Sequence, residues 1–584
     1  MQYNILPAPK SIEETQGTFN LVNAGIYLQN GLDARVVAKA EALRTRLCEK
    51  TGQKHLLSPG QEAKNSILIC KTKNIKAEEY ILEIDANGVK IEGGSDAGCF
   101  YGILTFLQIL ETDTNELSGV VIKDWPDMSY RGFYFDATRG RVPSVEGAKK
   151  LINRLASLKI NALQFYVEHT FDFKEFSSDN RTSNDYLTAK DILEIVNYCY
   201  QNFIDFQPSL STFGHLYELL SRKEYKHLCE LENYEDKSHF WKERMEHHTI
   251  DAANPESLQI VCSLIDQYLP LFRSEYFNIC CDETFDLCRG RNKGSNVADT
   301  YVGFVTKIID HVTACGKKVM MWADIALKYP HILSQLPADT VFLNWDYDAS
   351  PNTDNIKKIS ELGLTQIVCP GTQSWATFIE KPAVSVPNIL TMAKSGYENG
   401  VIGMLNTNWG DYGHTTHPEC SLYGTILGAC AAWSVDTQVD KIFNKAVSSS
   451  FYKTDVDIVE LIKQLEICHN SASWLHCYDW VYRRTPECFP CDVKTIEKSI
   501  KTAQNLSDAL GCAKGEKEIL ACLKNAADTI SLLNMAALDV KLNGVVSEEW
   551  RYKMEDWFGE YKNCWLISSK PSEITEIYNF LQRF

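Results

Sequence analysis

The sequence predicts an α/β fold: a closed (β/α)8 TIM barrel, preceded by a small α+β domain and followed by a helical C-terminal region. Within residues 125–440, a short apolar run, a polar tip and a helical stretch follow one another repeatedly. Strands that alternate with helices form a parallel sheet, and eight of them close into a barrel. The eight runs are 131–136, 160–168, 204–211, 276–283, 317–324, 340–347, 365–372 and 401–411.

The first 124 residues predict the α+β domain. Apolar residues have helical spacing in 34–48 and 99–110, whereas short runs at 66–70, 80–84 and 88–91 are typical of strands. The motif Asp124-Trp-Pro126 marks the end of this domain, because proline interrupts regular structure.

Helical stretches separate several of the barrel runs, at 145–158, 188–202, 255–271 and 301–315. The segment between the third and fourth runs is the longest, and we expect it to carry an insertion over the barrel mouth. Residues 441–584 then predict the helical region, with helices at 456–468, 493–510 and 516–538.

Charge and cysteine usage narrow the possible partners and compartment. The net charge of −17 argues against nucleic acid and anionic membranes as partners. The first ten residues have neither the basic nor the apolar segment of a secretory signal, and 20 cysteines in such a chain favour reduced thiols. We therefore expect a cytoplasmic protein.

The sequence predicts no metal and no cofactor. The motif Cys488-Phe-Pro-Cys491 has no second Cys-x-x-Cys to complete a zinc site, so we interpret it as a pair of plain thiols. No His-x-x-x-His motif occurs, and no Gly-rich phosphate loop follows a strand.

The fourth barrel run ends in two adjacent acids, Asp282 and Glu283. Neighbouring side chains of a strand point to opposite faces, so both acids can serve one site only where the strand ends and its backbone turns. Paired carboxylates can then share a reaction, one carrying a proton and the other a charge. An isolated Asp-Glu pair more often caps a helix, and the other strand ends decide between the two interpretations.

Those other strand ends are rich in polar and aromatic residues, and in this fold the C-terminal strand ends supply the active site. Aromatic rings pack against the C–H face of a sugar, polar side chains bind its hydroxyls, and paired carboxylates without a metal indicate glycoside hydrolysis. The residues concerned are Asp136, Arg139, Glu168, His215, Trp322, Asp324, Trp345, Trp375, Trp409 and Asp411.

Over nearly its whole length the chain resembles glycoside hydrolase family 20, the β-N-acetylhexosaminidases. The N-terminal domain carries the resemblance in Leu6-Pro-Ala-Pro-Lys10 and in residues 93–105. The start of the barrel carries it in residues 122–126, 130–132 and 136–139, and the catalytic strand end in Ile279-Cys-Cys-Asp282-Glu283.

The resemblance implies a retaining exo-hydrolase that removes terminal β-linked N-acetylglucosamine or N-acetylgalactosamine. In this family the substrate's 2-acetamido group is the nucleophile. Glu283 would be the general acid and base, and Asp282 would orient the acetamide. The remaining residues would bind the sugar: Arg139, Glu168 and Asp411 its hydroxyls, Trp322, Trp345, Trp375 and Trp409 its faces, with His215 tuning the acid.

The sequence leaves several points open. Asp411 stands where the family often has glutamate, so the choice between gluco and galacto sugars is open, and either Tyr347 or Tyr412 could contact the acetamide. Release of a disaccharide and glycan binding without catalysis are the alternative functions; the presence of both Asp282 and Glu283 argues against the second. A homo-oligomer whose subunits complete one another's sites is also open. His247 and His248 are expected on the surface of the insertion.

Overall fold

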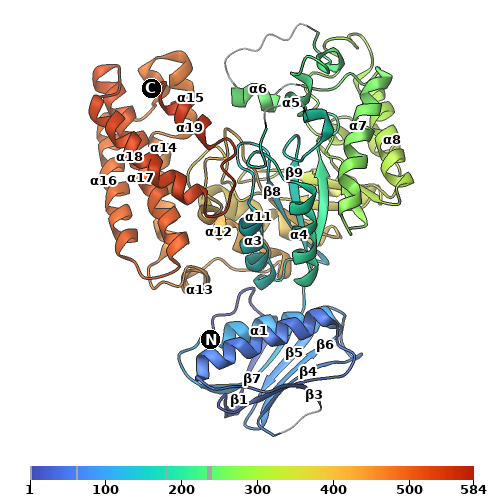
Figure 1. Ribbon diagram of the computed structural model, residues 1–584, viewed down its shortest axis with the longest axis vertical. Coiled ribbons are helices and arrows are strands. Elements are labelled where there is room, and N and C mark those ends of the chain that lie inside the picture. The colour runs from blue at the N-terminus through green and yellow to red at the C-terminus, as the bar shows by residue number, and fades with distance from the viewer. Residues whose placement is uncertain (1–2, 61–63, 178–180, 233–239, 247) are drawn as a thin grey trace.

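The computed structural model describes residues 3–60, 64–177, 181–232, 240–246 and 248–584. A central barrel carries the N-terminal domain at one end and the C-terminal helices along one side (Figure 1). Among the residues that the structure describes, no helix is long and apolar enough to cross a membrane.

The barrel consists of eight parallel strands and closes through the pairing of β15 with β8. Each strand lies within one of the eight predicted runs to within a residue or two, so the predicted barrel is confirmed. The strands are β8 (Tyr130–Asp136), β9 (Ala162–Val167), β10 (Asp205–Leu210), β11 (Tyr276–Asn278), β12 (Lys318–Trp322), β13 (Val341–Trp345), β14 (Gln366–Cys369) and β15 (Gly403–Asn408).

Helices surround the barrel, and the first four of those given next overlap the four helical stretches that the sequence predicts between barrel runs. They are α3 (Val145–Ser157), α4 (Ala189–Gln201), α7 (Pro255–Tyr268), α8 (Val297–Ala314), α9 (Asp324–Lys328), α10 (Asp354–Glu361), α11 (Pro382–Glu398) and α12 (Leu422–Trp433). The predicted insertion follows β10 and contains α5 (Tyr217–Leu220) and α6 (Phe240–Glu246), which lie beyond the barrel strands in Figure 1.

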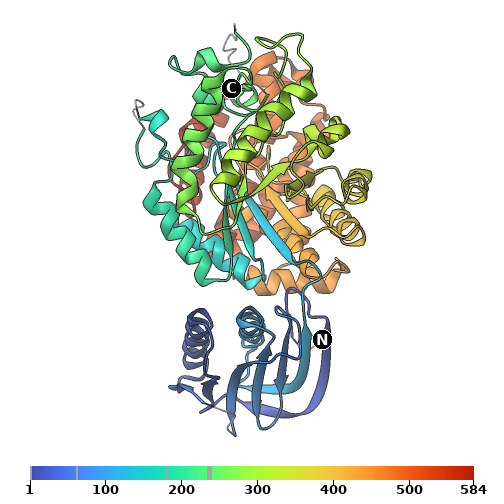
Figure 2. The ribbon, with the colours of Figure 1, turned by 90° about the vertical axis from the view of Figure 1, so that its right-hand side faces the viewer.

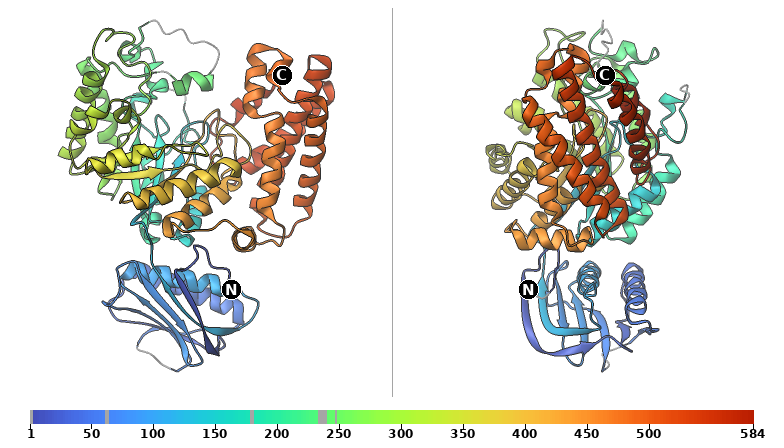
Figure 3. Two further views of the ribbon diagram at one scale, coloured as in Figure 1. Left: turned by 180° about the vertical axis from the view of Figure 1, so that it is seen from behind. Right: turned by 90° about the vertical axis from the view of Figure 1, so that its left-hand side faces the viewer.

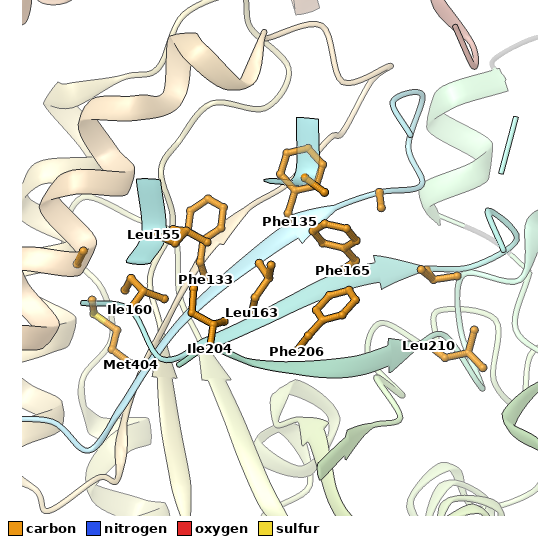
Figure 4. Close-up of a cluster of buried hydrophobic side chains, with 14 of the residues drawn as sticks. Phe133, Phe135, Leu155, Ile160, Leu163, Phe165, Ile204, Phe206, Leu210 and Met404 are labelled. Atoms are coloured by element: carbon orange, nitrogen blue, oxygen red, sulfur yellow. The ribbon is translucent and has the colours of Figure 1, made fainter. Parts of the chain in front are cut away.

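Side chains at successive strand positions alternate between the outside and the inside of the barrel. Phe133 and Phe135 of β8 and Phe165 of β9 point outward into the apolar layer between strands and helices (Figure 4). Tyr134 and Tyr166, from the same two strands, belong instead to the cluster inside the barrel. The interior therefore combines aromatic side chains with aliphatic ones such as Leu343 and Ile367.

The N-terminal domain is a seven-stranded sheet with α1 (Ala34–Thr51) and α2 (Asp96–Ile109) on one face (Figure 2). Its strand order is β1-β7-β5-β6-β4-β2-β3. The strands are β1 (Ser11–Asn20), β2 (Gly25–Leu28), β3 (Leu57–Pro59), β4 (Ser66–Lys71), β5 (Tyr80–Ile84), β6 (Gly88–Gly93) and β7 (Glu116–Asp124).

A buried ion pair joins this domain to the barrel. Lys159, which precedes β9, lies 2.8 Å from Asp124 at the end of β7, and both side chains are fully buried. Tyr80 and Trp433 also donate hydrogen bonds to Asp124, over 2.6 and 2.8 Å. Because Lys159 lies at the N-terminal end of the barrel strands, the N-terminal domain supports the barrel from the end opposite the predicted site.

The C-terminal helices pack beside the loop that follows β15 (Figure 3). Trp474 donates a hydrogen bond to the carbonyl of Tyr412, and Tyr561 donates one to the carbonyl of Thr415. The region thus holds the loop that carries Trp409 and Asp411. Its helices are α13 (Lys441–Phe451), α14 (Ile458–Ser471), α15 (Trp474–Arg483), α16 (Val493–Cys512), α17 (Lys517–Asn543), α18 (Glu548–Trp565) and α19 (Ile574–Leu581).

Candidate active site

The backbone turns sharply after β11, where the two adjacent acids lie. Cys280, Cys281 and Glu283 have φ angles of 58°, 63° and 46°, in the left-handed region that non-glycine residues rarely adopt. Such strain is typical of functional sites and costs about 1–3 kcal/mol per residue. The turn brings the side chains of Asp282 and Glu283 to the same histidine, so the adjacent acids do share one site.

Hydrogen bonds from neighbouring elements hold this turn. The hydroxyl of Tyr301 donates to the carbonyl of Cys281 over 2.7 Å, and the backbone N–H of Trp322 donates to the carbonyl of Cys280 over 3.0 Å. A Cβ on Gly214 would lie only 2.6 Å from the carbonyl oxygen of Asp282. Glycine is therefore required at position 214, immediately before His215.

His215 lies between the two acids. Its Nε2 atom is 3.6 Å from Asp282 Oδ2 and 3.3 Å from Glu283 Oε2, and its side chain is almost fully buried. Burial lowers the pKa of His215, but the contacts with Asp282 and Glu283 outweigh burial and raise it to about 10. The ring is thus an imidazolium at neutral pH, and its charge keeps the two carboxylates together.

Asp324 also contacts the acid turn, a role that its place at the fifth strand end did not predict. It is the first residue of α9, and its Oδ2 atom accepts the backbone N–H of Glu283 over 3.0 Å. Burial and the charge of Asp282 raise the pKa of Asp324 above its usual range. We infer that Asp324 positions Glu283 through this hydrogen bond.

Arg139 connects three other strand ends. Its guanidinium lies 3.1 Å from Asp411 after β15, 3.4 Å from Asp136 at the end of β8, and 3.8 Å from Glu168 after β9. Asp136 in turn accepts the backbone N–H of Gly410 over 3.0 Å. The structure thus gathers Arg139, Glu168 and Asp411, as the sequence predicts.

The charges of this group interact with those of the acid turn. Burial, together with the charges of Asp136 and Glu283, outweighs the effect of Arg139 and raises the pKa of Asp411 to about 6. Arg139 likewise acts on the pKa of His215. The two sets of residues therefore belong to one electrostatic site at the barrel mouth.

Three of the four predicted tryptophans gather around Tyr347. Trp345, which is half-buried, stacks on the Tyr347 ring at 5.1 Å, and the half-buried Trp375 meets it edge-on at 5.1 Å. Trp409 is more enclosed and donates its indole N–H to the Tyr347 hydroxyl over 2.7 Å. Of the two candidate tyrosines, Tyr347 therefore lies with the predicted sugar-binding rings.

Trp322 and Tyr412 lie elsewhere. Trp322 is fully buried, 5.7 Å from the Trp409 ring, because its strand position points into the barrel interior. It supports Trp409 from beneath and has no surface on which a sugar could pack. Tyr412 packs edge-on against Tyr478 of the C-terminal region.

The insertion contributes one buried cation that the sequence did not predict. Arg244 on α6 forms two 2.9 Å contacts with Glu573, near the C-terminus, and lies 3.0 Å from His169 Nε2. Burial raises the pKa of Glu168, and the charge of Arg244 is among those that oppose this rise. Arg244 thus ties the insertion and the C-terminal region to the second strand end, which no local pattern could have indicated.

The expectation that His248 lies on the surface is wrong. His248 is 3% exposed, its backbone N–H bonds Asp286 over 2.8 Å, and its ring meets Tyr217 edge-on. The end of the insertion folds back onto the loop after the acid turn and buries the ring. His247 lies outside the described residues.

A metal could be held at the acid turn only in competition with a proton. The ligand atoms of His215, Asp282 and Glu283 lie within 4.8 Å of one another. Histidine must be neutral to bind a metal, whereas contact with the two acids raises the pKa of this ring and keeps it protonated. The arrangement suits acid-base chemistry better than metal binding.

Comparisons with known proteins identify the family and agree with the fold. Residues 2–125 match the model of glycosyl hydrolase family 20, domain 2, and residues 128–395 match that of the family 20 catalytic domain. A beta-hexosaminidase of Porphyromonas gingivalis is 26% identical over 55% of this chain and 45% of its own length. A lacto-N-biosidase of Bifidobacterium bifidum is 22% identical over 50% of this chain and 26% of its own length. The chain thus spans less than half the length of these relatives.

Solved structures share the fold. The chitobiase of Flavobacterium johnsoniae superimposes with a TM-score of 0.64 at 18% identity, over 95% of this chain and 96% of its own. An N-acetyl-beta-hexosaminidase of Streptomyces plicatus superimposes with a TM-score of 0.60 at 16% identity, over 77% and 94%. At these identities the likeness shows the architecture alone.

Proposed function

Because the chain belongs to glycosyl hydrolase family 20, we propose that it is a retaining exo-β-N-acetylhexosaminidase acting on glycans or glycoconjugates. It would remove a terminal β-linked N-acetylglucosamine or N-acetylgalactosamine. The observation that carries the proposal is the turn after β11, which brings Asp282 and Glu283 together around the buried His215 imidazolium. A glycan-binding protein has no need for this strained arrangement.

The two acids differ in exposure, and this difference supports separate roles. The Glu283 side chain is 34% exposed, so it can reach the glycosidic oxygen, protonate it and later take a proton from water. The Asp282 side chain is 10% exposed and fixed beside His215. It suits the acetamide, whose carbonyl oxygen attacks the anomeric carbon and whose nitrogen then carries positive charge.

Tyr347 supports this role of Asp282 at the acetamide. Its hydroxyl accepts the indole N–H of Trp409, so its own proton can be donated to the acetamide oxygen. Burial raises the pKa of Tyr347, so its hydroxyl keeps its proton at neutral pH. We therefore propose that the acetamide contacts Tyr347, beside Trp345 and Trp375.

Arg139 supports release of a single sugar. Carboxylates from three strand ends hold the Arg139 guanidinium in place. The N–H donors of Arg139 and the carboxylates of Asp411 and Glu168 are therefore fixed relative to one another, and together they can bind the hydroxyls of one terminal sugar ring. This arrangement favours monosaccharide over disaccharide release.

The proposal is tested by chromophore release from paired substrates. The protein is expected to hydrolyse an aryl N-acetyl-β-glucosaminide and to leave the matching aryl β-glucoside intact, because the glucoside lacks the internal nucleophile. Similar rates on both would contradict the substrate-assisted mechanism. Release only from an aryl disaccharide would favour the biosidase alternative, and binding of N-acetylglucosamine without any turnover would favour a binding protein.

The raised pKa of Asp411 predicts a pH dependence of sugar binding. Above about pH 6 Asp411 is a carboxylate that pairs with Arg139 and accepts a sugar hydroxyl; below pH 6 it is protonated and loses both interactions. The loss of a charged hydrogen bond costs about 1.5–3 kcal/mol, so kcat/KM should fall about 10- to 100-fold as the pH is lowered through 6.

The measurement compares kcat/KM from pH 4 to 8 for the wild type and for Asp411→Asn. We expect an acidic limb near pH 6 in the wild type that is absent in the variant, because asparagine does not titrate. Asp310→Asn, on the exposed outer side of α8, is the matched control and should keep the limb. An unchanged limb in Asp411→Asn would assign it to another group.

We further propose that the protein acts in the cytoplasm. All 20 cysteines are free thiols, which supports the cytoplasmic location predicted from the sequence. We propose a glycan or glycoconjugate with a terminal N-acetylhexosamine as its partner, and a homo-oligomer as its assembly.

A further inference from the structure

We propose that the outer wall of the barrel carries a zinc site between α7 and α8, formed by Asp266, His311 and Cys315 with Cys262 as the fourth ligand. The two helices lie side by side on the barrel exterior (Figure 1), linked by a 2.8 Å contact between His311 Nε2 and Asp266 Oδ1. The site is separate from the barrel mouth and does not depend on the proposed function.

Three of these residues already cluster in space. One ligand atom each of Asp266, His311 and Cys315 lies within 4.8 Å of the other two. With zinc–ligand bonds of about 2.0–2.3 Å, tetrahedral ligand atoms lie about 3.3–3.8 Å apart. Atoms at the 4.8 Å limit would approach by about 1–1.5 Å, and the 2.8 Å contact between His311 and Asp266 would open by about 0.5 Å. Rotation of partly or fully exposed side chains can supply both movements.

The spacing along both helices places a fourth candidate ligand one helical turn from the three clustered residues. Cys262 and Asp266 are four residues apart on α7, and His311 and Cys315 are four residues apart at the end of α8, so each pair lies on one helix face. Cys262 therefore lies one helical turn from Asp266 on the same face of α7.

The ligand chemistry indicates zinc. Two thiols, an imidazole and a carboxylate suit Zn²⁺, which accepts sulfur, nitrogen and oxygen in tetrahedral sites. Thiolate ligands disfavour Mg²⁺ and Ca²⁺, which prefer oxygen alone. An ordinary surface histidine–aspartate pair explains His311 and Asp266 but leaves the two cysteines at matching helical positions unexplained.

The position of the site predicts its effect. Helix α7 precedes β11, and α8 follows the loop that begins at Glu283, so zinc would join the two helices that flank the catalytic strand. A metal that binds only the folded state stabilises that state. We expect zinc to raise the thermal midpoint, and removal of the site to leave glycosidase activity unchanged.

The test uses Co²⁺ as a spectroscopic probe of the reduced, full-length protein. One equivalent should produce near-ultraviolet thiolate-to-cobalt absorption and visible bands of tetrahedral cobalt, both abolished by added Zn²⁺. Cys315→Ser and His311→Gln should lose these bands. The double substitution Cys488→Ser with Cys491→Ser is the matched control, because it removes the one Cys-x-x-Cys motif and should keep them.

Absence of thiolate bands in the wild type, their persistence in Cys315→Ser, or their loss in the Cys488/Cys491 control would each overturn the proposal. Cys315 is exposed and at the end of its helix, so its substitution should not prevent folding. A second measurement checks this point: Zn²⁺ should raise the thermal midpoint of the wild type and of the control, but not that of Cys315→Ser.

Discussion

Replacement of Glu283 by glutamine is expected to lower kcat about 10²- to 10⁴-fold on a substrate with a poor leaving group, the range typical of a lost general acid. Glutamine keeps the size of the side chain but cannot protonate the glycosidic oxygen. KM should change little, because the residues proposed to bind the sugar hydroxyls lie at other strand ends.

The measurement that identifies the acid is the dependence on leaving group. The dinitrophenolate of a dinitrophenyl glycoside departs without protonation. Cleavage of this substrate by Glu283→Gln should therefore be far less impaired than cleavage of chitobiose. An equal loss on both substrates would mean that Glu283 is not the acid. Glu275→Gln is the matched control: this glutamate immediately precedes β11, is 76% exposed and pairs with exposed Lys318, so wild-type rates are expected.

The barrel could be predicted from the sequence because its strands carry a local signal. Each run is apolar on both faces, since one face meets the helices and the other fills the interior, as Phe133 and Tyr134 show. The edge strand β1 was not predicted, for the opposite reason. Most of its side chains are exposed, so Ser11–Asn20 shows no apolar alternation and is recognisable only by its pairing with β7.

The residues of the candidate site also include some that the sequence predicts and some that it does not. Asp282, Glu283 and Arg139 stand at strand ends, and because such ends meet at the mouth of a barrel, their sequence positions alone predict that they lie together. Arg244 lies in an insertion with no periodic pattern, and its partner Glu573 is 329 residues away. Only the folded chain reveals such a pair.

A strand-end position predicts where a side chain begins but not where it points. Trp322 and Trp409 both stand at strand ends, yet Trp322 is fully buried beneath Trp409. Likewise, the adjacency of Asp282 and Glu283 in the sequence predicts a turn. It does not predict that His215 lies between the two side chains, because that position depends on the close approach of the Gly214 backbone to Asp282.

Replacement of Asp282 by asparagine should lower kcat on an aryl N-acetyl-β-glucosaminide about 10²- to 10³-fold, the cost typical of removing one preorganised electrostatic partner of the transition state. Asparagine has nearly the same shape and can still accept the acetamide N–H. It lacks the negative charge that balances the developing oxazolinium, so the substitution should lower kcat and change KM little. Asp310→Asn again serves as the control that changes an exposed aspartate without touching the site.

A binding measurement separates this charge effect from a general disturbance. A cationic thiazoline analogue of the intermediate should bind Asp282→Asn much more weakly than the wild type, whereas neutral N-acetylglucosamine should bind both alike. Equal affinities for the analogue would exclude Asp282 as the charge partner.

The same variant makes a prediction that is independent of substrate. Asp282 is the strongest of the contacts that raise the pKa of His215 to about 10, so the histidine in Asp282→Asn should titrate at lower pH, as measured by NMR. Because the folded-state pKa is raised, this pairing contributes stability that is complete below about pH 6.5 and is lost as pH rises toward 10. The variant should therefore lose stability relative to the wild type most clearly at neutral and mildly acidic pH, and the two should converge near pH 10. An unshifted His215 would mean that Glu283 alone holds the imidazolium, and the acid pair would then not be coupled through it.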